Sequence, residues 1–150
     1  MKTRYFVRRL RAADLERVQE IEKASFGKYA YDRNLFAEFF HNCGDLFLAA
    51  EGKGGGVCGY MITCARGDQA ELVSVAIDPA ARRTGAATSL LESTLRRLRR
   101  RGVTRLRLMV KWNNREARNF YEKHGFRKVR IVRRYYEDGA DGLLMACRLV

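Results

Sequence analysis

The feature that most constrains the fold is an abrupt change of pattern between residues 71 and 87. An apolar, β-branched run extends from Leu72 to Ile77 and stops at Asp78-Pro79. A short basic loop containing Gly85 follows, and a helical pattern begins directly after it. The first backbone N–H groups of a helix lack intrahelical partners, and the helix dipole adds positive charge beside them. A strand, a small-residue loop and a helix N-terminus in this order therefore predict a phosphate-binding site.

The loop itself supplies charge and room for an anion. Arginine side chains bind phosphate oxygens strongly, and glycine and alanine leave the backbone accessible. The alternative is an ordinary connection between a strand and a helix, with its arginines in solvent. Neither a P-loop nor a dinucleotide fingerprint is present, because no Gly-Lys-Ser/Thr and no three-glycine pattern occurs here. The predicted phosphate-binding residues are Arg82, Arg83, Thr84, Gly85, Ala86 and Ala87.

Composition places the chain among globular proteins. Its 150 residues are 47% hydrophobic, which predicts one domain over residues 1–150 and excludes a disordered chain. No apolar run approaches the roughly 18 residues that span a bilayer, and the basic N-terminus lacks the apolar stretch of a secretory signal. Four scattered cysteines without a Cys-x-x-Cys pair, and only two histidines, predict neither a metal site nor a disulfide framework. We therefore expect a cytoplasmic protein in a reducing compartment.

The charge is unbalanced, with 30 Lys and Arg against 17 Asp and Glu and a formal net charge of +13. Such a chain attracts polyanions, and the candidate partners are nucleic acid, the ribosome or a phosphate-rich cofactor. Five arginines lie together at the end of a predicted helix. A solvated helix end that favours the dipole is one interpretation, and proximity to RNA or the ribosome is the other. These residues are Arg96, Arg97, Arg99, Arg100 and Arg101.

Hydrophobic periodicity alternates in the order β-α-α-β-β-β-α-β-α-β-β, which indicates an α/β protein with a sheet of mixed direction. Lys53-Gly54-Gly55-Gly56 is interpreted as a hairpin turn and not as a phosphate loop, because a strand follows it. Strands are expected near residues 5–9, 46–50, 57–65, 71–77, 105–110, 126–133 and 142–149, and helices near 15–26, 32–41, 86–101 and 114–124.

Two motifs resemble those of the GNAT N-acetyltransferase superfamily. Arg82-x-x-Gly85-x-Ala87 resembles its Arg/Gln-x-x-Gly-x-Gly/Ala signature, whose loop grips the pyrophosphate of acetyl-coenzyme A (acetyl-CoA). Residues 113–126 are similar to its Asn-x-x-Ala-x-x-x-Tyr-x-x-x-Gly-Phe helix. The matched positions of that helix are Asn114, Ala117, Tyr121, Gly125 and Phe126.

A third stretch, residues 133–145, is similar to the Arg-x-Tyr-Tyr…Asp-Ala-x-x-Met tail of RimI-type protein N-terminal acetyltransferases, with Gly142 where that tail usually has alanine. The resemblance implies a single-domain GNAT fold, a mixed and mostly antiparallel sheet of about seven strands with flanking helices. It also implies that the strands 71–77 and 105–110 splay apart and that the co-substrate acetyl-CoA lies in the gap. Besides the phosphate loop, the implied cofactor contacts are Val75, Ala76, Ile77, Asn114 and Ala117.

Acetyl transfer to an amine needs a neutral amine, an oriented thioester and a proton donor for the departing thiolate. The resemblance places Tyr121 near the coenzyme sulfur, where a phenol is a suitable donor. The alternative is a core aromatic residue packed against Phe126.

The proton acceptor is less clear from the sequence. RimI-type enzymes often carry glutamate where this chain has Met109, and a thioether cannot accept a proton. Glu71 lies at the start of the strand before the phosphate loop, where histone-type members of the superfamily keep a catalytic glutamate. A solvated carboxylate is the alternative for Glu71, and a water relay without a dedicated base is a third possibility.

For the acceptor, the resemblance implies that the loop between the first two helices and a Tyr-Tyr hairpin clamp a peptide N-terminus. The Phe-x-x-Pro-Trp form of the first loop is absent here, and packing within the hairpins is the alternative role for these tyrosines. The corresponding residues are Phe26, Tyr29, Tyr31, Tyr135 and Tyr136.

Together these observations predict an acetyl-CoA-dependent N-acetyltransferase that acts on a protein N-terminal α-amine, as a monomer or homodimer. One alternative is an acetyltransferase for polyamines or aminoglycosides, whose pockets need acidic residues that a chain of this charge fits poorly. Another is a catalytically idle module that binds acetyl-CoA or RNA. Cys58 and Cys64 are expected to be core residues and not nucleophiles.

Overall fold

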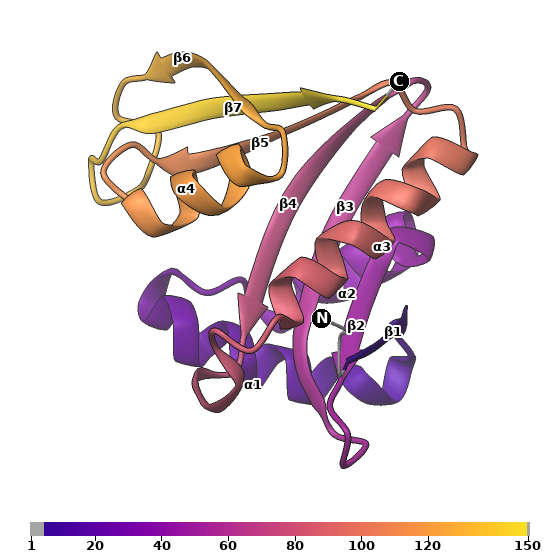
Figure 1. Ribbon diagram of the computed structural model, residues 1–150. Helices are drawn as coiled ribbons and strands as arrows, with labels where there is room; N and C mark the ends of the chain where they lie inside the picture. Colours follow the sequence, from indigo (N-terminus) through magenta and orange to yellow (C-terminus); the bar gives the residue numbers. More distant parts are fainter. Residues whose placement is uncertain (1–4, 150) are drawn as a thin grey trace. The chain divides into compact units, whose positions relative to one another are not determined.

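The computed structural model describes residues 5–149, in which seven strands and four α-helices form (Figure 1). The strands are β1 (Phe6–Arg9), β2 (Phe47–Glu51), β3 (Val57–Arg66), β4 (Gln69–Ile77), β5 (Arg105–Lys111), β6 (Arg127–Val132) and β7 (Gly142–Arg148). The helices are α1 (Leu15–Phe26), α2 (Arg33–Cys43), α3 (Ala86–Arg100) and α4 (Arg115–Lys123). The sheet is open, with the strand order β1-β2-β3-β4-β5-β7-β6, and it confirms the expected element order. None of the described helices is long and apolar enough to cross a membrane.

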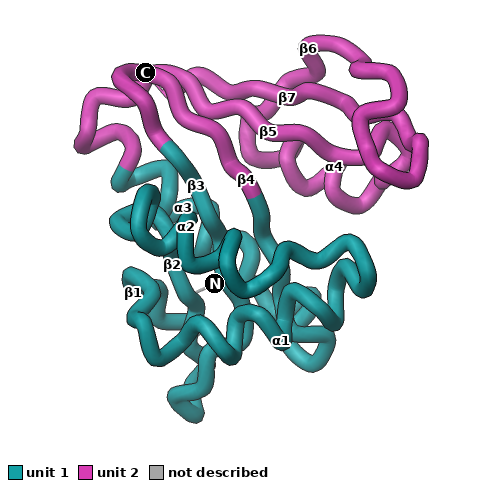
Figure 2. Tube along the Cα trace, turned by 180° about the vertical axis from the view of Figure 1, so that it is seen from behind, with its two compact units in different colours: residues 1–64, 74–97 teal, residues 65–73, 98–150 magenta. Residues whose placement is uncertain are grey.

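The chain forms two compact units, which Figure 2 distinguishes by colour. Unit 1 comprises residues 1–64 and 74–97, and unit 2 comprises residues 65–73 and 98–150. Strand β4 and helix α3 each contribute residues to both units. The expectation of one domain over residues 1–150 stays a prediction, because this division by packing does not show which parts fold on their own.

In unit 1, helices lie on both faces of β3. Successive residues of a strand point to opposite faces. Tyr60 contacts Phe36 of α2, with ring centroids 5.7 Å apart, whereas Sδ of Met61 lies 3.4 Å from Oγ1 of Thr94 on α3. All four side chains are buried. Burial on both faces also explains why the strands β2 and β3 read as almost continuous apolar runs.

A buried carboxyl group joins three elements of unit 1. Glu22 of α1 is 1% exposed and accepts a hydrogen bond from the Tyr60 hydroxyl of β3. Ser74 of β4 donates to the same oxygen at 3.4 Å and lies 3.2 Å from the Tyr60 hydroxyl. The other carboxyl oxygen accepts from the backbone N–H of Tyr31 at 2.9 Å. Glu22 therefore fixes the segment after α1 against the sheet.

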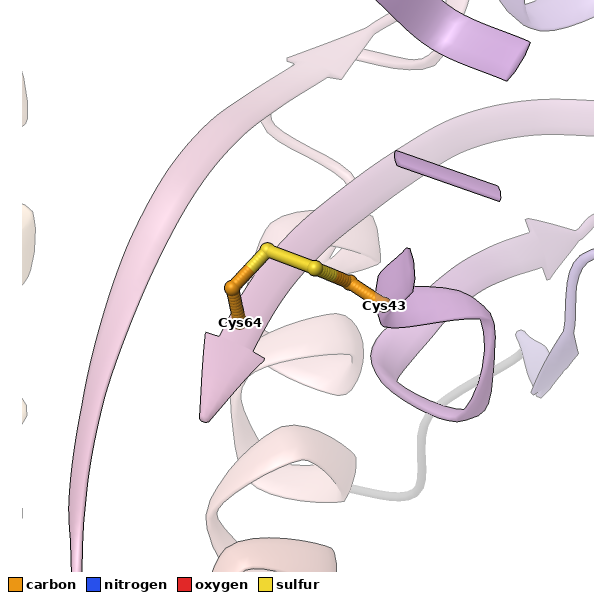
Figure 3. Close-up of a disulfide and its surroundings, with 2 residues drawn as sticks. All are labelled: Cys43 and Cys64. Atoms are coloured by element: carbon orange, nitrogen blue, oxygen red, sulfur yellow. A yellow bond between two sulfur atoms is a disulfide. The ribbon is translucent and has the colours of Figure 1, made fainter. Parts of the chain in front are cut away.

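A disulfide bond joins the end of α2 to β3 in unit 1 (Figure 3). The sulfurs of Cys43 and Cys64 are 2.11 Å apart and their Cα atoms 5.2 Å apart. The prediction that the cysteines form no disulfide is therefore wrong for this pair. Packing of α2 on β3 brings the two residues together, and their sequence separation of 21 matches no local motif.

In unit 2, the first residues of β4 pair with β5 in parallel, and β7 pairs in antiparallel with both β5 and β6. Alternate residues of β5 are buried, so one face of these strands belongs to the core. The buried side chains on that face include Leu106, Leu108, Leu143 and Met145. The residues on the other face include several exposed arginines.

Candidate functional site

The predicted phosphate loop begins where β4 ends and is ordered by its own residues. The Asp78 carboxylate accepts a hydrogen bond from the Ala80 N–H at 2.9 Å and caps the short turn Pro79–Ala81. Arg17 of α1 pairs with Asp78 and donates from Nε to the Val57 carbonyl at 3.0 Å. The hydrogen bond from the Ala80 N–H contributes most to holding the pKa of Asp78 below its usual range, and the bond from the Arg17 guanidinium contributes next. The loop is thus tied to α1 and to β3.

Two of the predicted phosphate-binding side chains turn back onto the protein. Nε of Arg82 donates to the Ile77 carbonyl at 3.3 Å, and its guanidinium also reaches Oγ of Ser25 at 3.3 Å. The Thr84 hydroxyl donates to the Ala81 carbonyl and contacts the Tyr5 hydroxyl. Arg82 and Thr84 therefore shape the loop, and both stay exposed.

The backbone of the loop leads directly into the first turn of α3. Arg83 has a φ of 62° and Gly85 a φ of 97°, so two left-handed residues turn the chain just before α3. Gly85 has no side chain to cap the N–H groups of Ala86 and Ala87. These amides and the helix dipole provide the electrostatics that an anion needs.

The strand before the loop carries the other predicted cofactor contacts of unit 1. Val75 and Ile77 are partly exposed, and Ala76 is buried. The parallel pairing of β4 with β5 extends from Gln69 opposite Arg105 to Leu72 opposite Leu108, and both strands continue beyond that last pair.

In unit 2, Tyr121 is 5% exposed and packs between two aromatic rings of the same segment. Its ring centroid lies 5.2 Å from Phe120 and 5.4 Å from Phe126. Burial raises the pKa of the Tyr121 phenol, and nearby Tyr136 raises it further. Within residues 5–149 no group hydrogen-bonds the Tyr121 hydroxyl. The phenol thus packs as a core aromatic and also keeps its proton at neutral pH.

The Tyr-Tyr segment is held in a well-ordered turn between β6 and β7. Tyr135 is 49% exposed and stacks edge-on with Tyr136 at 5.0 Å. Lys111 of β5 lies 5.6 Å over the Tyr136 ring and pairs with Asp138 at 2.5 Å. Backbone hydrogen bonds close the turn, from Tyr136 N–H to the Ala140 carbonyl at 3.1 Å among others. This turn therefore fixes the position of Tyr136, which is near enough to Tyr121 to raise its pKa.

Asn114 has a structural role at the start of α4. Its side-chain oxygen accepts from the Ala117 N–H at 3.1 Å, which makes Asn114 the N-cap of α4. Within residues 5–149 its amide nitrogen has no hydrogen-bond partner, and the side chain is exposed.

Glu71 is the third residue of β4, since the strand begins two residues earlier than expected. It lies opposite Arg107 of β5, and both side chains are exposed. An exposed carboxylate is chemically able to accept a proton from an amine. The role of Glu71 as a base stays a prediction.

Two departures from the RimI-type pattern are in direct contact. A Cβ atom at Gly142 would lie 2.9 Å from Sδ of Met109, 3.0 Å from Cγ of Met109 and 3.0 Å from Cβ of Tyr135. The Met109 side chain therefore occupies the room that alanine at position 142 would need.

Gly142→Ala is expected to destabilise the protein by about 2 kcal/mol, because an added methyl group overpacks this contact. In the double variant with Met109→Ala, the loss is expected to be smaller than the sum of the two single losses by about 1 kcal/mol. Urea unfolding of the four proteins measures this coupling. Additive losses would show that Met109 and Gly142 are independent.

The predicted acceptor residues of unit 1 divide into two groups. Phe26 is 41% and Tyr29 is 44% exposed, and Lys28 lies 5.2 Å over the Tyr29 ring. Tyr31 instead packs against Phe36 and Phe39, with centroids 6.2 and 5.7 Å away. The packing alternative therefore describes Tyr31, whereas Phe26 and Tyr29 remain accessible.

Sequence reasoning missed two residues that support the site. Glu22 anchors the segment that contains Tyr31, and Arg17 holds the phosphate loop through Asp78. Both residues lie on one face of α1, which also includes Val18 and Ile21. The spacing could have revealed this face, but its mixture of charged and apolar residues concealed it.

Neither Cys58 nor Cys64 is suited to nucleophilic attack. Burial raises the pKa of the Cys58 thiol, and Cys64 is disulfide-bonded.

Residues 12–126 match the model of the acetyltransferase (GNAT) family. The ribosomal protein bS18-alanine N-acetyltransferase of Escherichia coli (strain K12) is 33% identical over 141 residues, which cover 91% of this chain and 93% of that protein. An N-alpha-acetyltransferase of Sulfurisphaera tokodaii is 28% identical over an alignment of 158 positions, gaps included, which covers 97% of this chain and 93% of that protein. The crystal structure of Ard1 from Thermoplasma volcanium has a TM-score of 0.92 at 25% identity and covers 99% of both chains. The expected fold is thereby confirmed.

Proposed function

Because the chain belongs to the acetyltransferase (GNAT) family and is an acetyl-CoA-dependent N-acetyltransferase, we propose that its acceptor is the α-amino group of a protein N-terminus. The observation that carries the proposal is the stacked pair of Tyr135, which is exposed, and Tyr136, which is near enough to the buried Tyr121 to raise its pKa. This pair is proposed to offer aromatic surface to a peptide near the proposed proton donor. The Escherichia coli relative is named an N-acetyltransferase for alanine of ribosomal protein bS18, and the Sulfurisphaera relative is named an N-alpha-acetyltransferase. Both names support the same acceptor.

Acetyl-CoA supplies the acetyl group as a thioester, and the loop from Arg82 to Ala87 is proposed to hold its pyrophosphate. The amides at the start of α3 and the two arginines fit that charge. Backbone groups of Val75–Ile77 are proposed to orient the thioester and polarise its carbonyl, and Asn114 and Ala117 to contact the cofactor from α4.

The acceptor amine attacks the thioester carbonyl, the C–S bond breaks, and the amine loses a proton. The Tyr121 phenol is proposed to donate a hydrogen bond to the departing sulfur, since its raised pKa keeps it protonated. Glu71 is proposed to receive the amine proton. An α-amine has a pKa near 8, so a carboxylate base or water suffices at neutral pH.

The proposal is tested by thiol release from acetyl-CoA with matched acceptors. These are short peptides with a free N-terminus, the same peptides with a blocked N-terminus and an internal lysine, a polyamine, and no acceptor. Turnover is expected only with free N-termini. Glu71→Gln is expected to lower kcat/KM about tenfold at pH 7, and by less above pH 8, where the amine is already neutral.

Glu92→Gln on the exposed face of α3 is the matched control and is expected to leave turnover unchanged. Turnover with the polyamine alone would identify a small-amine acetyltransferase. Binding of acetyl-CoA without turnover on any acceptor would identify an idle binding module. Equal rates for Glu71→Gln and wild type would remove Glu71 from the mechanism.

A further inference from the structure

The exposed face of the sheet in unit 2 carries a group of arginines for which acetyl transfer gives no role. Unit 2 holds sixteen Lys and Arg residues against seven Asp and Glu, and so most of the excess positive charge of the chain. Five of these arginines lie on neighbouring strands and are all exposed. We call them the arginine face: Arg105, Arg107, Arg127, Arg130 and Arg148.

Strand register places the five side chains on one side of the sheet. Arg105 of β5 lies directly opposite Arg148 of β7. Arg107 of β5 and Arg127 of β6 both lie opposite Ala146, one on each side of β7. Directly opposite residues of an antiparallel pair point to the same face. Arg130 extends the group through its pairing with Leu144, the next residue of β7 on that face.

The arrangement is unfavourable for the isolated protein. Like charges directly opposite each other destabilise a strand pair, and Arg105 and Arg148 form such a pair. Within residues 5–149, none of the five side chains makes a hydrogen bond or an ion pair. The nearest acidic residue in the register is Glu71, opposite Arg107. The face is therefore suited to an anionic partner from outside the chain.

Protection of a sheet edge accounts for only part of the group. Charged residues and bulges on edge strands prevent association between sheets. This explains Arg127 and Arg130 on β6, which is the edge strand and has an irregularity between Lys128 and Arg130. It does not explain Arg105 and Arg148, because β5 and β7 are interior strands.

From this geometry we infer that the arginine face binds the phosphate backbone of RNA. Adjacent strands lie about 4.8 Å apart and alternate residues about 6.7 Å apart, so the five arginines are spaced across a surface that a chain of phosphates can follow. Arginine is the side chain best suited to two-pronged phosphate contacts. An anionic membrane fits less well, since exposed Ile131 pairs with Leu143 and thus points to the other face.

The choice of RNA over DNA rests on the proposed function, because protein N-termini emerge beside ribosomal RNA. The test measures fluorescence anisotropy of a labelled single-stranded RNA of about 20 nucleotides, without acetyl-CoA or acceptor, at several salt concentrations. The face variant is Arg105→Gln, Arg127→Gln and Arg148→Gln together. The control is Arg33→Gln, Arg96→Gln and Arg100→Gln together, which removes the same charge from exposed positions elsewhere.

The face variant is expected to bind RNA at least about tenfold more weakly at 100 mM salt, while the control stays within about threefold of wild type. In the face variant, the slope of log affinity against log salt concentration is expected to be smaller in magnitude by about two. Its melting temperature is expected to be unchanged or higher, because a pair of like charges is removed. The inference would be overturned if both variants lost RNA affinity equally, or if the control lost more. It would also be overturned if the wild-type protein bound duplex DNA, polyglutamate or anionic vesicles as tightly as RNA. A failure of acetyl transfer would leave these binding results unaffected.

Discussion

Tyr121→Phe is expected to lower kcat about 100-fold and to change KM for acetyl-CoA by less than about threefold, because only the proposed donor hydroxyl is removed. The ring stays packed between Phe120 and Phe126. Burial raises the pKa of the phenol, so the wild-type hydroxyl is protonated throughout the neutral range and able to stabilise a departing thiolate. Steady-state thiol release with a free N-terminal peptide measures both constants.

Thermal unfolding separates this effect from a loss of structure. No group within residues 5–149 hydrogen-bonds the Tyr121 hydroxyl, so its removal is expected to shift the melting temperature by no more than about 3 °C. Phe126→Leu provides the opposite control, since it weakens the packing and keeps the hydroxyl. A kcat for Tyr121→Phe within twofold of wild type would leave Tyr121 with the packing role alone.

The order of elements was predictable because most of the chain follows its local pattern. Helix α1 begins after Asp14 and ends before Gly27, and both ends carry residues typical of helix ends. β4 stops before Asp78-Pro79, and α3 starts after Gly85, as the loop pattern predicts. The N-cap role of Asn114 was equally local, because a side chain three residues before Ala117 decides it.

Contacts between residues distant in sequence were not predictable in this way. The Cys43–Cys64 disulfide depends on how α2 packs on β3. The contact of Met109 with Gly142 depends on the register of β5 and β7, which pairs their neighbours Val110 and Leu143. Such contacts can be identified only once the packing of two strands, or of a helix on a strand, is known. Each residue alone fits the local pattern of its own element.

The candidate site shows the same division. Arg82 and Gly85 were identified from a motif of adjacent positions, and the structure gives them the expected loop and helix start. Roles that depend on a bound substrate, such as that of Glu71 as a base, stay predictions, because an exposed carboxylate on a strand looks the same with or without that role.

Glu22→Ala is expected to lower the free energy of unfolding by about 4 kcal/mol. The change leaves the Tyr31 N–H without its acceptor, and the hydroxyls of Tyr60 and Ser74 keep only each other. Each buried donor without a partner costs about 1–3 kcal/mol, and the lost side-chain volume adds a cavity beside the Tyr60 ring. Urea unfolding followed by circular dichroism measures the loss.

Two further variants separate the buried hydrogen bonds from the helix itself. Glu16→Ala changes an exposed glutamate of the same helix and is expected to alter the stability by no more than about 0.5 kcal/mol. Glu22→Met combined with Tyr60→Phe replaces the paired groups by apolar groups of similar size. The double variant is expected to lose less free energy of unfolding than the two single variants together, because fewer polar groups are left buried without partners. A loss below about 1 kcal/mol for Glu22→Ala would mean that water reaches these groups, and the carboxyl would then not fix the segment containing Tyr31.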